Sequence, residues 1–529
     1  MVSKILRFFS QSDSFFARVP LAILGGLSLA SSFPAITFIP GAFLGIFLIV
    51  LAVRGIKFLK AFWLGLFAGF SFYGLVLIWL TTYLGPIPWF ALSFMEAIFF
   101  AISFGVIAVV WRYLNALKLG SWKNTVVAFA IGGIYTGREF VSSHFPFGGL
   151  PWARIGVSQA DNFLAKWAWG IDIAGLSWLI VFVSALLALQ VLSPLPIGSG
   201  IVNRVKSWTP TLTAWLIFFT LPALFVLPSP TTSGALKVAA VQGNANAGLF
   251  AHNPPGSILD KHLRVAKKLI ASGKAKNLDL MVWPENSADL DPINVAEENV
   301  KVTIFVNEVL KAPLLFGNKT FRGVDYFNEV DLWNPVKGLT DWYDKKRPVP
   351  FGEYVPYRSF FMGLAPDMIG LIGWDMSPGT RDGVFDIKKN VRVGSLICFE
   401  ATIDELGYDL VDNGAQAIMI QTNSSDFGKS EQGVQLAGIS RMRAIVTGRT
   451  VVAISTVGLS GIYTPDGHIV KELPMFTPAA MVANISLRSD KTPAVIFGRY
   501  IEAGAFVFAI ALFLIALIGL TIARARRRA

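Results

Sequence analysis

The chain has 529 residues, of which 53% are hydrophobic and only 15% are charged. This composition excludes a single soluble globule, and the length leaves room for several domains. The formal net charge is +12, but the basic residues stand in short loops between apolar segments and form no recognised basic–aromatic motif. We therefore expect a membrane protein that binds no nucleic acid.

Apolar segments dominate the first 230 residues, and each is about as long as a helix that crosses roughly 30 Å of hydrocarbon. They cover residues 19–34, 35–53, 61–84, 89–114, 125–143, 171–194 and 210–228. A further apolar segment, 504–523, precedes an arginine-rich tail. The sequence predicts a polytopic α-helical membrane protein with about eight transmembrane helices. A cleavable signal peptide is a poor alternative, because apolar segments continue past any cleavage site.

Basic residues indicate the orientation of these segments. With a cytoplasmic N-terminus, the inner positions collect Lys4, Arg7, Arg18, Arg54, Lys57, Lys60, Arg112, Lys118, Lys123, Arg204 and Lys206. On the other side, only the loop after the fifth segment carries basic residues, namely Arg138, Arg154 and Lys166. The positive-inside rule therefore predicts that the seventh segment ends on the outer face and that both termini are cytoplasmic.

A Pro/Ser/Thr/Gly linker at 228–234 leads into a long stretch of ordinary soluble composition. Apolar runs predict strands at 237–242, 278–283, 314–317, 393–397, 417–421, 451–455 and 481–485, and an amphipathic helix at 257–274. Strands that alternate with helices indicate a mixed α/β domain. We predict a membrane domain at 1–230, an extracytoplasmic domain at 231–495, and a last helix with a basic tail at 496–529.

Cys398 is the only cysteine in the chain, so an intramolecular disulfide is impossible. It follows the apolar run 393–397, and we predict a buried strand that delivers it at a sharp strand-to-helix turn. Such a turn exposes a nucleophile and directs backbone N–H groups at it. An inert buried thiol is the alternative. The four histidines lie outside any catalytic-looking stretch, which disfavours a Cys–His dyad.

Three other stretches carry acid or base side chains: 282–286 with Glu285, 343–353 with Lys345, and Glu400. A thiol with a pKa of about 8.5 is mostly protonated at neutral pH, so it needs a base or a neighbouring cation to become nucleophilic. Glu285 is the candidate base, and Lys345 is the candidate cation for a tetrahedral oxyanion. Solvated surface charges are the alternative interpretation of both side chains.

A Glu after Trp-Pro, a Lys before Pro-Phe-Gly-Glu and a Cys followed by an aromatic residue and Glu stand here in that order. Together they resemble the Glu-Lys-Cys signature of the nitrilase superfamily. With the flanking membrane segments, the chain resembles the apolipoprotein N-acyltransferase family over essentially its whole length. The resemblance implies a nitrilase-like αββα sandwich with Glu285, Lys345 and Cys398 as catalytic residues. It also implies that Glu353 orients the lysine, with Phe399 and Glu400 as supporting residues.

The resemblance further implies an acyltransferase without a cofactor or a metal. Its cysteine would take a fatty acyl chain from a phospholipid as a thioester, and would pass the chain to the N-terminal amine of diacylglyceryl-cysteine on apolipoproteins. The expected partners are the bilayer, the phospholipid and diacylglyceryl-modified lipoproteins. The expected location is the bacterial inner (cytoplasmic) membrane, as a monomer. Alternatives are a membrane-tethered amidase or nitrilase-type hydrolase, which would use water as acceptor, and a non-enzymatic receptor or transporter.

Two departures from the family pattern stand out. Phe399 occupies the position after the cysteine where relatives commonly carry Tyr, and the stretch 423–428 lacks a tryptophan that relatives often have. Two apolar loops, 357–364 and 368–374, follow Glu353. We predict that they dip into lipid as a lid, and buried packing is the alternative.

Overall fold

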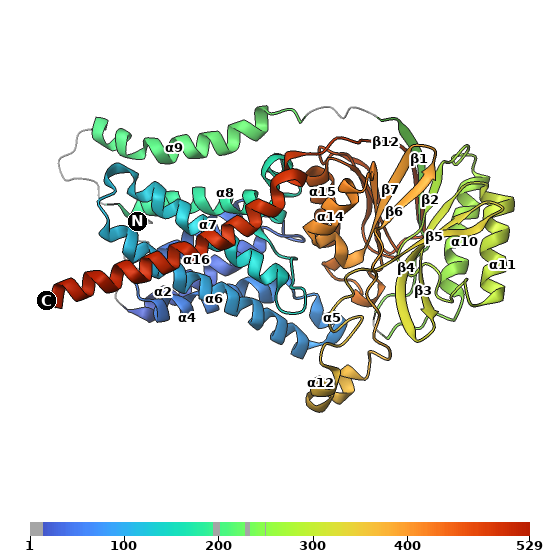
Figure 1. Cartoon of the computed structure of the whole chain (residues 1–529), viewed down its shortest axis with the longest axis horizontal. Coiled ribbons are helices and arrows are strands. Elements are labelled where there is room, and N and C mark those ends of the chain that lie inside the picture. Colours follow the sequence, from blue (N-terminus) through green and yellow to red (C-terminus); the bar gives the residue numbers. More distant parts are fainter. Residues whose placement is uncertain (1–13, 194–200, 228–232, 249, 529) are drawn as a thin grey trace. The chain divides into compact units, whose positions relative to one another are not determined.

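The computed structural model describes residues 14–193, 201–227, 233–248 and 250–528 (Figure 1). Lys4, Arg7 and most of the predicted linker, residues 228–232, lie outside the described residues. The chain divides into two compact units. We call the first the helical unit; its described residues are those up to 81, 85–227 and 496–528. The second, the α/β unit, contains residues 82–84 and the described residues of 228–495.

Helices build nearly all of the helical unit. They are α2 (Phe15–Ser31), α3 (Pro40–Val53), α4 (Phe58–Val76), α5 (Leu80–Leu84), α6 (Pro86–Ala116), α7 (Lys123–His144), α8 (Trp167–Leu192), α9 (Ile201–Leu224) and, at the end of the chain, α16 (Pro493–Arg528). The predicted third apolar segment, 61–84, was too long, because α4 already ends at Val76 and residues 82–84 belong to the α/β unit. Apolar composition alone cannot distinguish a residue that faces lipid from one that packs on protein.

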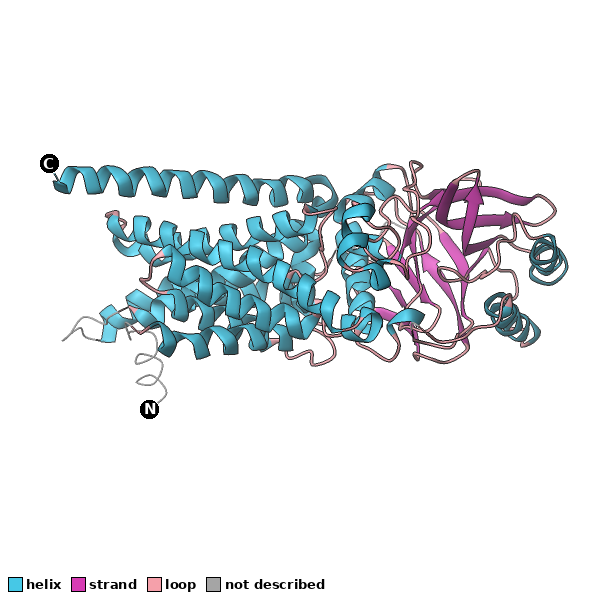
Figure 2. Ribbon diagram, turned by 90° about the horizontal axis from the view of Figure 1, so that it is seen from below, coloured by secondary structure: helices cyan, strands magenta, loops and turns pink. Residues whose placement is uncertain are grey.

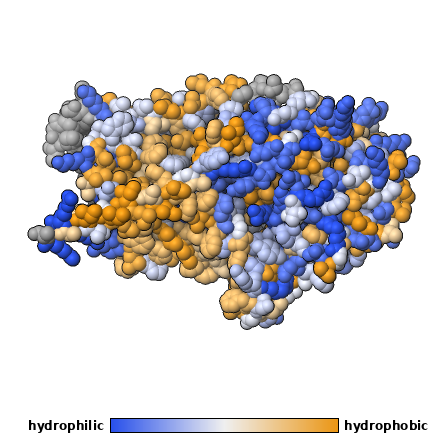
Figure 3. Space-filling model, in the orientation of Figure 1, coloured by the Kyte–Doolittle hydropathy of each residue, from blue (hydrophilic) through white to orange (hydrophobic). Residues whose placement is uncertain are grey.

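Within the described residues, four helical stretches are long and apolar enough to cross a membrane: 58–76, 86–116, 163–192 and 493–528. Helices α2 and α3 are apolar but have only 17 and 14 residues. On the face drawn in Figure 3, hydrophobic residues cover much of the helical unit, as expected for a surface in contact with lipid. The structure therefore has several helices able to span a bilayer, and the predicted number of about eight stays a prediction.

The helical unit also buries charged side chains that pair with one another. Arg138 was expected in a loop, and this was wrong: it lies inside α7, buried, and donates a hydrogen bond of 2.5 Å to the Tyr73 hydroxyl. Its Nη2 atom is 3.8 Å from Oε1 of Glu139. Elsewhere in this unit, Nη1 of Arg154 lies 3.8 Å from Oε1 of Glu502. Pairing reduces the cost of holding charges in an apolar interior.

The α/β unit contains two six-stranded sheets. The first has the order β12-β1-β2-β3-β4-β5 and the second β11-β10-β9-β8-β7-β6. Their bounds are β1 (Ala235–Gln242), β2 (Leu280–Val282), β3 (Leu314–Arg322), β4 (Asp325–Asn334), β5 (Gly338–Asp344), β6 (Val384–Lys388), β7 (Val391–Ile397), β8 (Ala417–Thr422), β9 (Thr450–Ser455), β10 (Ser460–Tyr463), β11 (Ile469–Leu473) and β12 (Ala479–Ser486). All seven predicted strands are confirmed.

The two sheets pack face to face between two layers of helices, as Figure 2 shows with the strands in magenta. Alternate residues of both sheets, among them Val282, Val393 and Ile397, form the core between the sheets. Helices α10 (Ser257–Ala271) and α11 (Ala296–Ile304) lie outside the first sheet, and α14 (Asp404–Asp412) and α15 (Gln432–Thr447) lie outside the second (Figure 1). The result is a helix–sheet–sheet–helix sandwich, the αββα arrangement expected from the sequence.

Parallel pairing determines where the site forms. Strand β2 pairs in parallel with β1 and β3, and β8 pairs in parallel with β7 and β9. The carboxyl ends of parallel strands meet at one edge of a sheet, where α/β folds carry their ligand sites. Glu285 follows the end of β2 and Cys398 follows the end of β7. The fold therefore brings side chains 113 positions apart in the sequence to neighbouring strand ends.

Candidate active site

Cys398 stands where β7 gives way to a short 3₁₀ turn, Cys398–Thr402. Its φ angle is +51°, in the left-handed region that a residue with a Cβ atom adopts only under constraint from its surroundings. The preceding strand is fixed by the Ser395 hydroxyl, which donates 2.8 Å to Gln421, and by the amide of Gln421, which donates 2.8 Å to the carbonyl of Trp283. The predicted strand-to-turn delivery of the cysteine is confirmed, and Cys398 as a whole residue is partly buried.

Glu285 is buried, with an exposed fraction of 4%, and both of its carboxylate oxygens are oriented by donors. Oε2 accepts a hydrogen bond of 2.7 Å from the backbone N–H of Asn423, which follows the end of β8. Oε1 accepts one of 2.7 Å from the side chain of Asn328 on β4. The carboxylate is therefore held at the strand ends by one backbone donor and one side-chain donor.

Lys345 follows β5 and is 1% exposed. Its Nζ atom lies 2.8 Å from Oε1 of Glu353 and 3.5 Å from Oε1 of Glu285. Burial alone would lower the pKa of Lys345, but the charges of these two carboxylates outweigh it and raise the pKa above its usual value. The lysine is therefore a fixed cation between two carboxylates.

Glu353 is the closer partner of the lysine. Its Oε2 atom accepts a hydrogen bond of 2.6 Å from the backbone N–H of Val349, and its Oε1 atom also accepts one of 2.7 Å from Asn328. Burial would raise the pKa of Glu353, but Lys345 and these donors lower it below its usual value. Glu353 is therefore ionised at neutral pH and holds the lysine in position.

Cys398 lies within the electrostatic influence of the same groups. Burial and the charge of Glu285 raise the pKa of Cys398 well above that of a free thiol, and Lys345 opposes this increase only in part. The resting side chain is therefore a protonated thiol rather than a thiolate. Such a thiol needs a neighbouring proton acceptor at the moment of attack, and Glu285 is the carboxylate whose charge acts most strongly on it.

Glu400 connects the turn after Cys398 to the chain that follows Lys345. Its oxygens accept hydrogen bonds from the Tyr343 hydroxyl at 3.0 and 3.1 Å, and from the backbone N–H groups of Ile397, Lys346 and Arg347 at 2.9, 2.8 and 3.2 Å. Burial raises the pKa of Glu400 to about 7. Phe399, the other predicted supporting residue, accepts a hydrogen bond of 2.8 Å from Thr402 at its carbonyl.

Arg443 supports the same turn from α15. It is fully buried and donates 2.9 Å to the carbonyl of Ala401 and 2.7 Å to Oδ1 of Asp404. A buried arginine is retained where several acceptors fix its planar group. The backbone around Cys398 is therefore held by charged side chains on both sides, Glu400 and Arg443.

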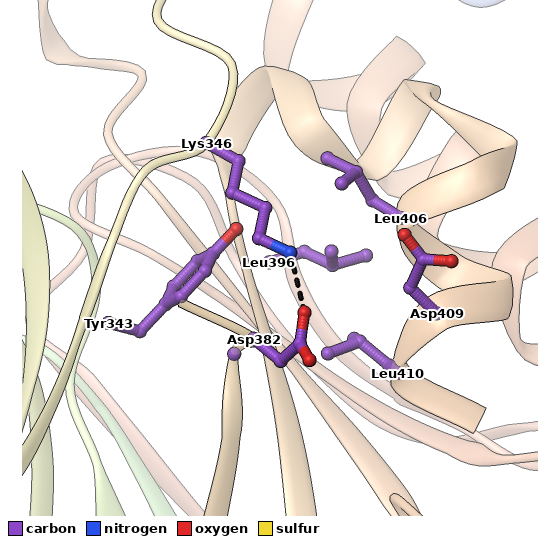
Figure 4. Close-up of a pocket in the computed structure, with 8 residues that line it drawn as sticks. Tyr343, Lys346, Asp382, Leu396, Leu406, Asp409 and Leu410 are labelled. Atoms are coloured by element: carbon purple, nitrogen blue, oxygen red, sulfur yellow. Dashed lines mark hydrogen bonds and ion pairs between the residues drawn. The ribbon is translucent and has the colours of Figure 1, made fainter. Parts of the chain in front are cut away.

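A small, open pocket lies beside Tyr343 (Figure 4). At its edge, Nζ of Lys346 lies 2.6 Å from Oδ1 of Asp382. The remaining lining residues are Gly383, Leu396, Leu406, Asp409 and Leu410. Within the described part of the chain, the lining includes none of the three candidate catalytic residues. Lys346 has a partner of its own here, which supports Lys345 as the lysine of the site.

Asn328 is the residue of this site that the sequence analysis missed. It is buried, and its single side-chain nitrogen donates to both Glu285 and Glu353. Its strand was not predicted because the segment Asp325–Asn334 contains charged and polar residues at buried positions. A weak signal was available, since Tyr326, Asn328 and Val330 alternate with period two.

The two apolar loops after Glu353 are folded but exposed. Helix α12 (Arg358–Leu364) and helix α13 (Pro366–Ile369) lie in this region. Tyr357 is 77% exposed and Trp374 is 67% exposed, while Phe360, Leu364 and Leu371 are also exposed. Buried packing, the alternative interpretation of these loops, is therefore wrong for most of their large side chains.

Comparisons with known proteins cover both units. Residues 25–186 match the family model of the apolipoprotein N-acyltransferase N-terminal domain, and residues 315–491 match that of carbon-nitrogen hydrolase. The apolipoprotein N-acyltransferase of Mycolicibacterium smegmatis is 31% identical to this chain, over 95% of this chain and 85% of the relative. Those of Geobacter metallireducens and Pseudomonas putida are 26% and 27% identical, over 91% and 89% of this chain and 91% and 92% of the relatives.

Among solved structures, an amidase from Nesterenkonia sp. aligns with 49% of this chain and 94% of its own. The sequence identity is 15% and the TM-score is 0.37.

Proposed function

This chain belongs to the apolipoprotein N-acyltransferase family, and we propose that it moves a fatty acyl chain from a phospholipid to the N-terminal amine of diacylglyceryl-cysteine on apolipoproteins. The similarity to such enzymes extends over 95% of the chain. The observation that carries the proposed chemistry is the arrangement at the strand ends. There, Lys345 lies 3.5 Å from Glu285, and the charges of both act on the thiol of Cys398.

In the first half-reaction, Glu285 accepts the proton of the Cys398 thiol as sulfur attacks the carbonyl carbon of a phospholipid ester. The carbonyl oxygen becomes an oxyanion, which the Lys345 cation stabilises together with a backbone N–H near Cys398. The bond from the carbonyl carbon to the glycerol oxygen then breaks. That oxygen takes the proton from Glu285, which leaves a lysophospholipid and a thioester on Cys398.

In the second half-reaction, the N-terminal amine of the lipoprotein attacks the thioester carbonyl. Glu285 accepts a proton from the amine, the carbon–sulfur bond breaks, and the same proton returns to the sulfur of Cys398. The products are an amide and the free thiol. The same oxyanion contacts with Lys345 serve both halves, so ping-pong kinetics follow.

The supporting residues have separate tasks in this proposal. Glu353 holds the lysine at 2.8 Å, and Asn328 sets the distance between the two carboxylates through paired bonds of 2.7 Å. Glu400 links the turn that carries Cys398 to the segment that carries Lys345, because it accepts hydrogen bonds from the backbone of both. Phe399 supplies no hydroxyl, so its part is limited to backbone and packing.

We further propose seven transmembrane helices in the domain 1–230, the catalytic domain at 231–495 on the extracytoplasmic face, and a last transmembrane helix in 496–529. The loop charges support this orientation, and so does the continuous helix α16, which ends in Arg526, Arg527 and Arg528. Both termini are then cytoplasmic, and the acyl donor and the lipoprotein meet the site from the outer leaflet. The exposed loops 357–364 and 368–374 act as a lid in contact with lipid.

The experiment that tests the function is mass spectrometry of a lipoprotein N-terminus from bacteria with and without this protein. The proposal predicts an added acyl mass on the amine when the protein is present, and a free amine when Cys398→Ala replaces it. A membrane-tethered hydrolase would instead release free fatty acid or ammonia and leave the lipoprotein amine unmodified. The proposed enzyme acts as a monomer and uses neither a cofactor nor a metal.

A further inference from the structure

Tyr83 belongs to the α/β unit in the structure, although in the sequence it lies outside the predicted catalytic domain, 231–495. Residues 82–84 group with the α/β unit, whereas their neighbours in the sequence, up to 81 and from 85, group with the helical unit. Tyr83 lies in α5, between the apolar helices α4 and α6. The α/β unit therefore includes one short segment that no fragment beginning at residue 228 would contain.

The ring of Tyr83 packs on the loop that follows β8. Its centroid lies 4.6 Å from that of Phe427, at an interplanar angle of 44°. The neighbouring Thr82 approaches Gly428, where its Cγ2 atom would be 3.2 Å from a Cβ placed on the glycine. This loop begins at Asn423, whose backbone N–H holds Glu285. One side of Tyr83 is therefore fixed to the segment that orients the candidate base.

The hydroxyl of Tyr83 lies beside the loop that carries Glu353. A Cβ placed on Gly352 would be 3.8 Å from the hydroxyl oxygen, an ordinary contact distance, so the hydroxyl lies next to this loop. The charge that acts most strongly on the hydroxyl is that of Asp426. It is followed by Glu353, Cys398 and Lys345 of the candidate site. Tyr83 thus lies between the two loops that hold the base and the lysine of the site.

The hydroxyl remains available for a ligand. Across the described ranges of the chain, it donates no hydrogen bond to another residue, and a phenol is a protonated donor at neutral pH. Its surroundings contain a thiol that becomes acylated and a cation for the oxyanion, so the group it would meet is the ester or thioester of the acyl substrate. An ester oxygen is an acceptor that a phenolic O–H can bind.

We infer that Tyr83 binds the acyl substrate, its hydroxyl donating a hydrogen bond to an ester oxygen of the phospholipid while its ring forms a wall of the site with Phe427. This inference rests on the proposed acyltransferase function. The site of the enzyme is then incomplete without a residue that the membrane-associated half of the sequence supplies. Tyr83 also supplies a phenolic hydroxyl to the site, whereas Phe399, the residue after the nucleophile, has none.

The test uses the full-length protein in detergent and a synthetic diacyl phospholipid of defined acyl mass, and it follows the rate at which the acyl adduct forms. Tyr83→Phe keeps the ring and removes the hydroxyl, and we expect it to slow adduct formation roughly tenfold or more. The matched control is Tyr326→Phe, because Tyr326 is also a tyrosine of the α/β unit whose ring packs on a phenylalanine, 4.4 Å from Phe321. Tyr326→Phe should acylate at the wild-type rate.

A third variant, Phe427→Leu, separates the hydroxyl from the packing, since it removes the aromatic ring that packs on Tyr83 and keeps the Tyr83 hydroxyl. A rate for Tyr83→Phe equal to that of wild type would overturn the inference. So would an equal loss in Phe427→Leu and Tyr83→Phe, because packing would then account for both. If wild type itself forms no adduct, the proposed function fails rather than this assignment.

Discussion

The Nζ atom of Lys345 lies 2.8 Å from Oε1 of Glu353, which makes Glu353 the nearest carboxylate to the proposed oxyanion cation. Both side chains are largely buried, so removing one charge leaves the other poorly compensated. Glu353→Gln should lower the free energy of unfolding by about 3 kcal/mol. It should also slow acylation of Cys398 at least about a hundredfold, because the lysine would then turn towards Glu285.

The neighbouring pair provides a control for this prediction. Nζ of Lys346 lies 2.6 Å from Oδ1 of Asp382, and the Asp382 side chain is half exposed. Asp382→Asn should change the free energy of unfolding by less than about 1 kcal/mol and leave acylation unchanged. Denaturant titration and intact-mass kinetics on both variants check this. An equal effect of the two substitutions would argue against a special role for Glu353.

Asn328 donates to Glu285 and Glu353 at 2.7 Å each, so it fixes the separation of the two carboxylates. Asn328→Ala removes both bonds. Since each bond to a charged group contributes about 1.5–3 kcal/mol, we expect acylation to slow by roughly two orders of magnitude or more. Asn334→Ala, on the same strand but bonded to the Thr340 hydroxyl rather than to a carboxylate, is the matched control and should have the wild-type rate. A wild-type rate in Asn328→Ala would show that the carboxylates need no bridge.

The reactivity of the thiol should respond to its two charged neighbours in opposite directions. Burial and Glu285 raise the pKa of Cys398, and Lys345 lowers it. Glu285→Gln should therefore lower this pKa, so that alkylation by iodoacetamide becomes faster at a given pH, although acyl transfer is lost with the base. Lys345→Met should raise the pKa and shift the alkylation profile to higher pH.

Alkylation rates between about pH 6 and 10, measured without lipid, give these profiles. The opposite signs of the two shifts are what distinguish electrostatic neighbours of the thiol from residues that only support the fold. If Glu285→Gln slowed alkylation as strongly as it slows acyl transfer, Glu285 would not be a negative charge beside the thiol.

The orientation in the membrane can be tested with one accessible position in each part of the chain. In a Cys398→Ala background, Val324→Cys introduces a thiol at a residue that is 93% exposed in the α/β unit. A membrane-impermeant maleimide applied to spheroplasts should label it. Lys57→Cys, in a predicted inner loop, should be labelled only after the membrane is opened. The reverse pattern would overturn the proposed topology.

Much of the fold could be predicted because its signals are local. The buried parallel strands are continuous apolar runs, which is why β7, β8 and β9 were found from sequence. Strands β4 and β5 were missed because they carry buried charged residues, such as Glu329 of β4, which pairs with Arg322 at the end of β3 at 2.6 Å. Pairing of this kind depends on tertiary structure, so hydropathy along the chain cannot reveal it.

Part of the candidate site was also predictable, because its signals are local in the sequence. Glu285, Lys345 and Cys398 lie in short motifs whose residue types suit the chemistry. Asn328 and Tyr83 do not, since each reaches the site through contacts between segments far apart in the sequence. Tyr83 was also hidden inside an apolar stretch, where an aromatic residue is expected to face lipid or packed helices.

The most direct test of the central claim, a covalent acyl-enzyme at Cys398, is intact-mass measurement of the purified full-length protein after incubation with phospholipid alone. The account predicts an adduct of one acyl chain on wild type, none on Cys398→Ala, and strongly slowed formation on Glu285→Gln and Lys345→Ala. Loss of the adduct on treatment with hydroxylamine would identify it as a thioester. Wild-type protein that transfers acyl chains to a lipoprotein amine without passing through this adduct, or a Cys398→Ala protein that still transfers them, would contradict the account.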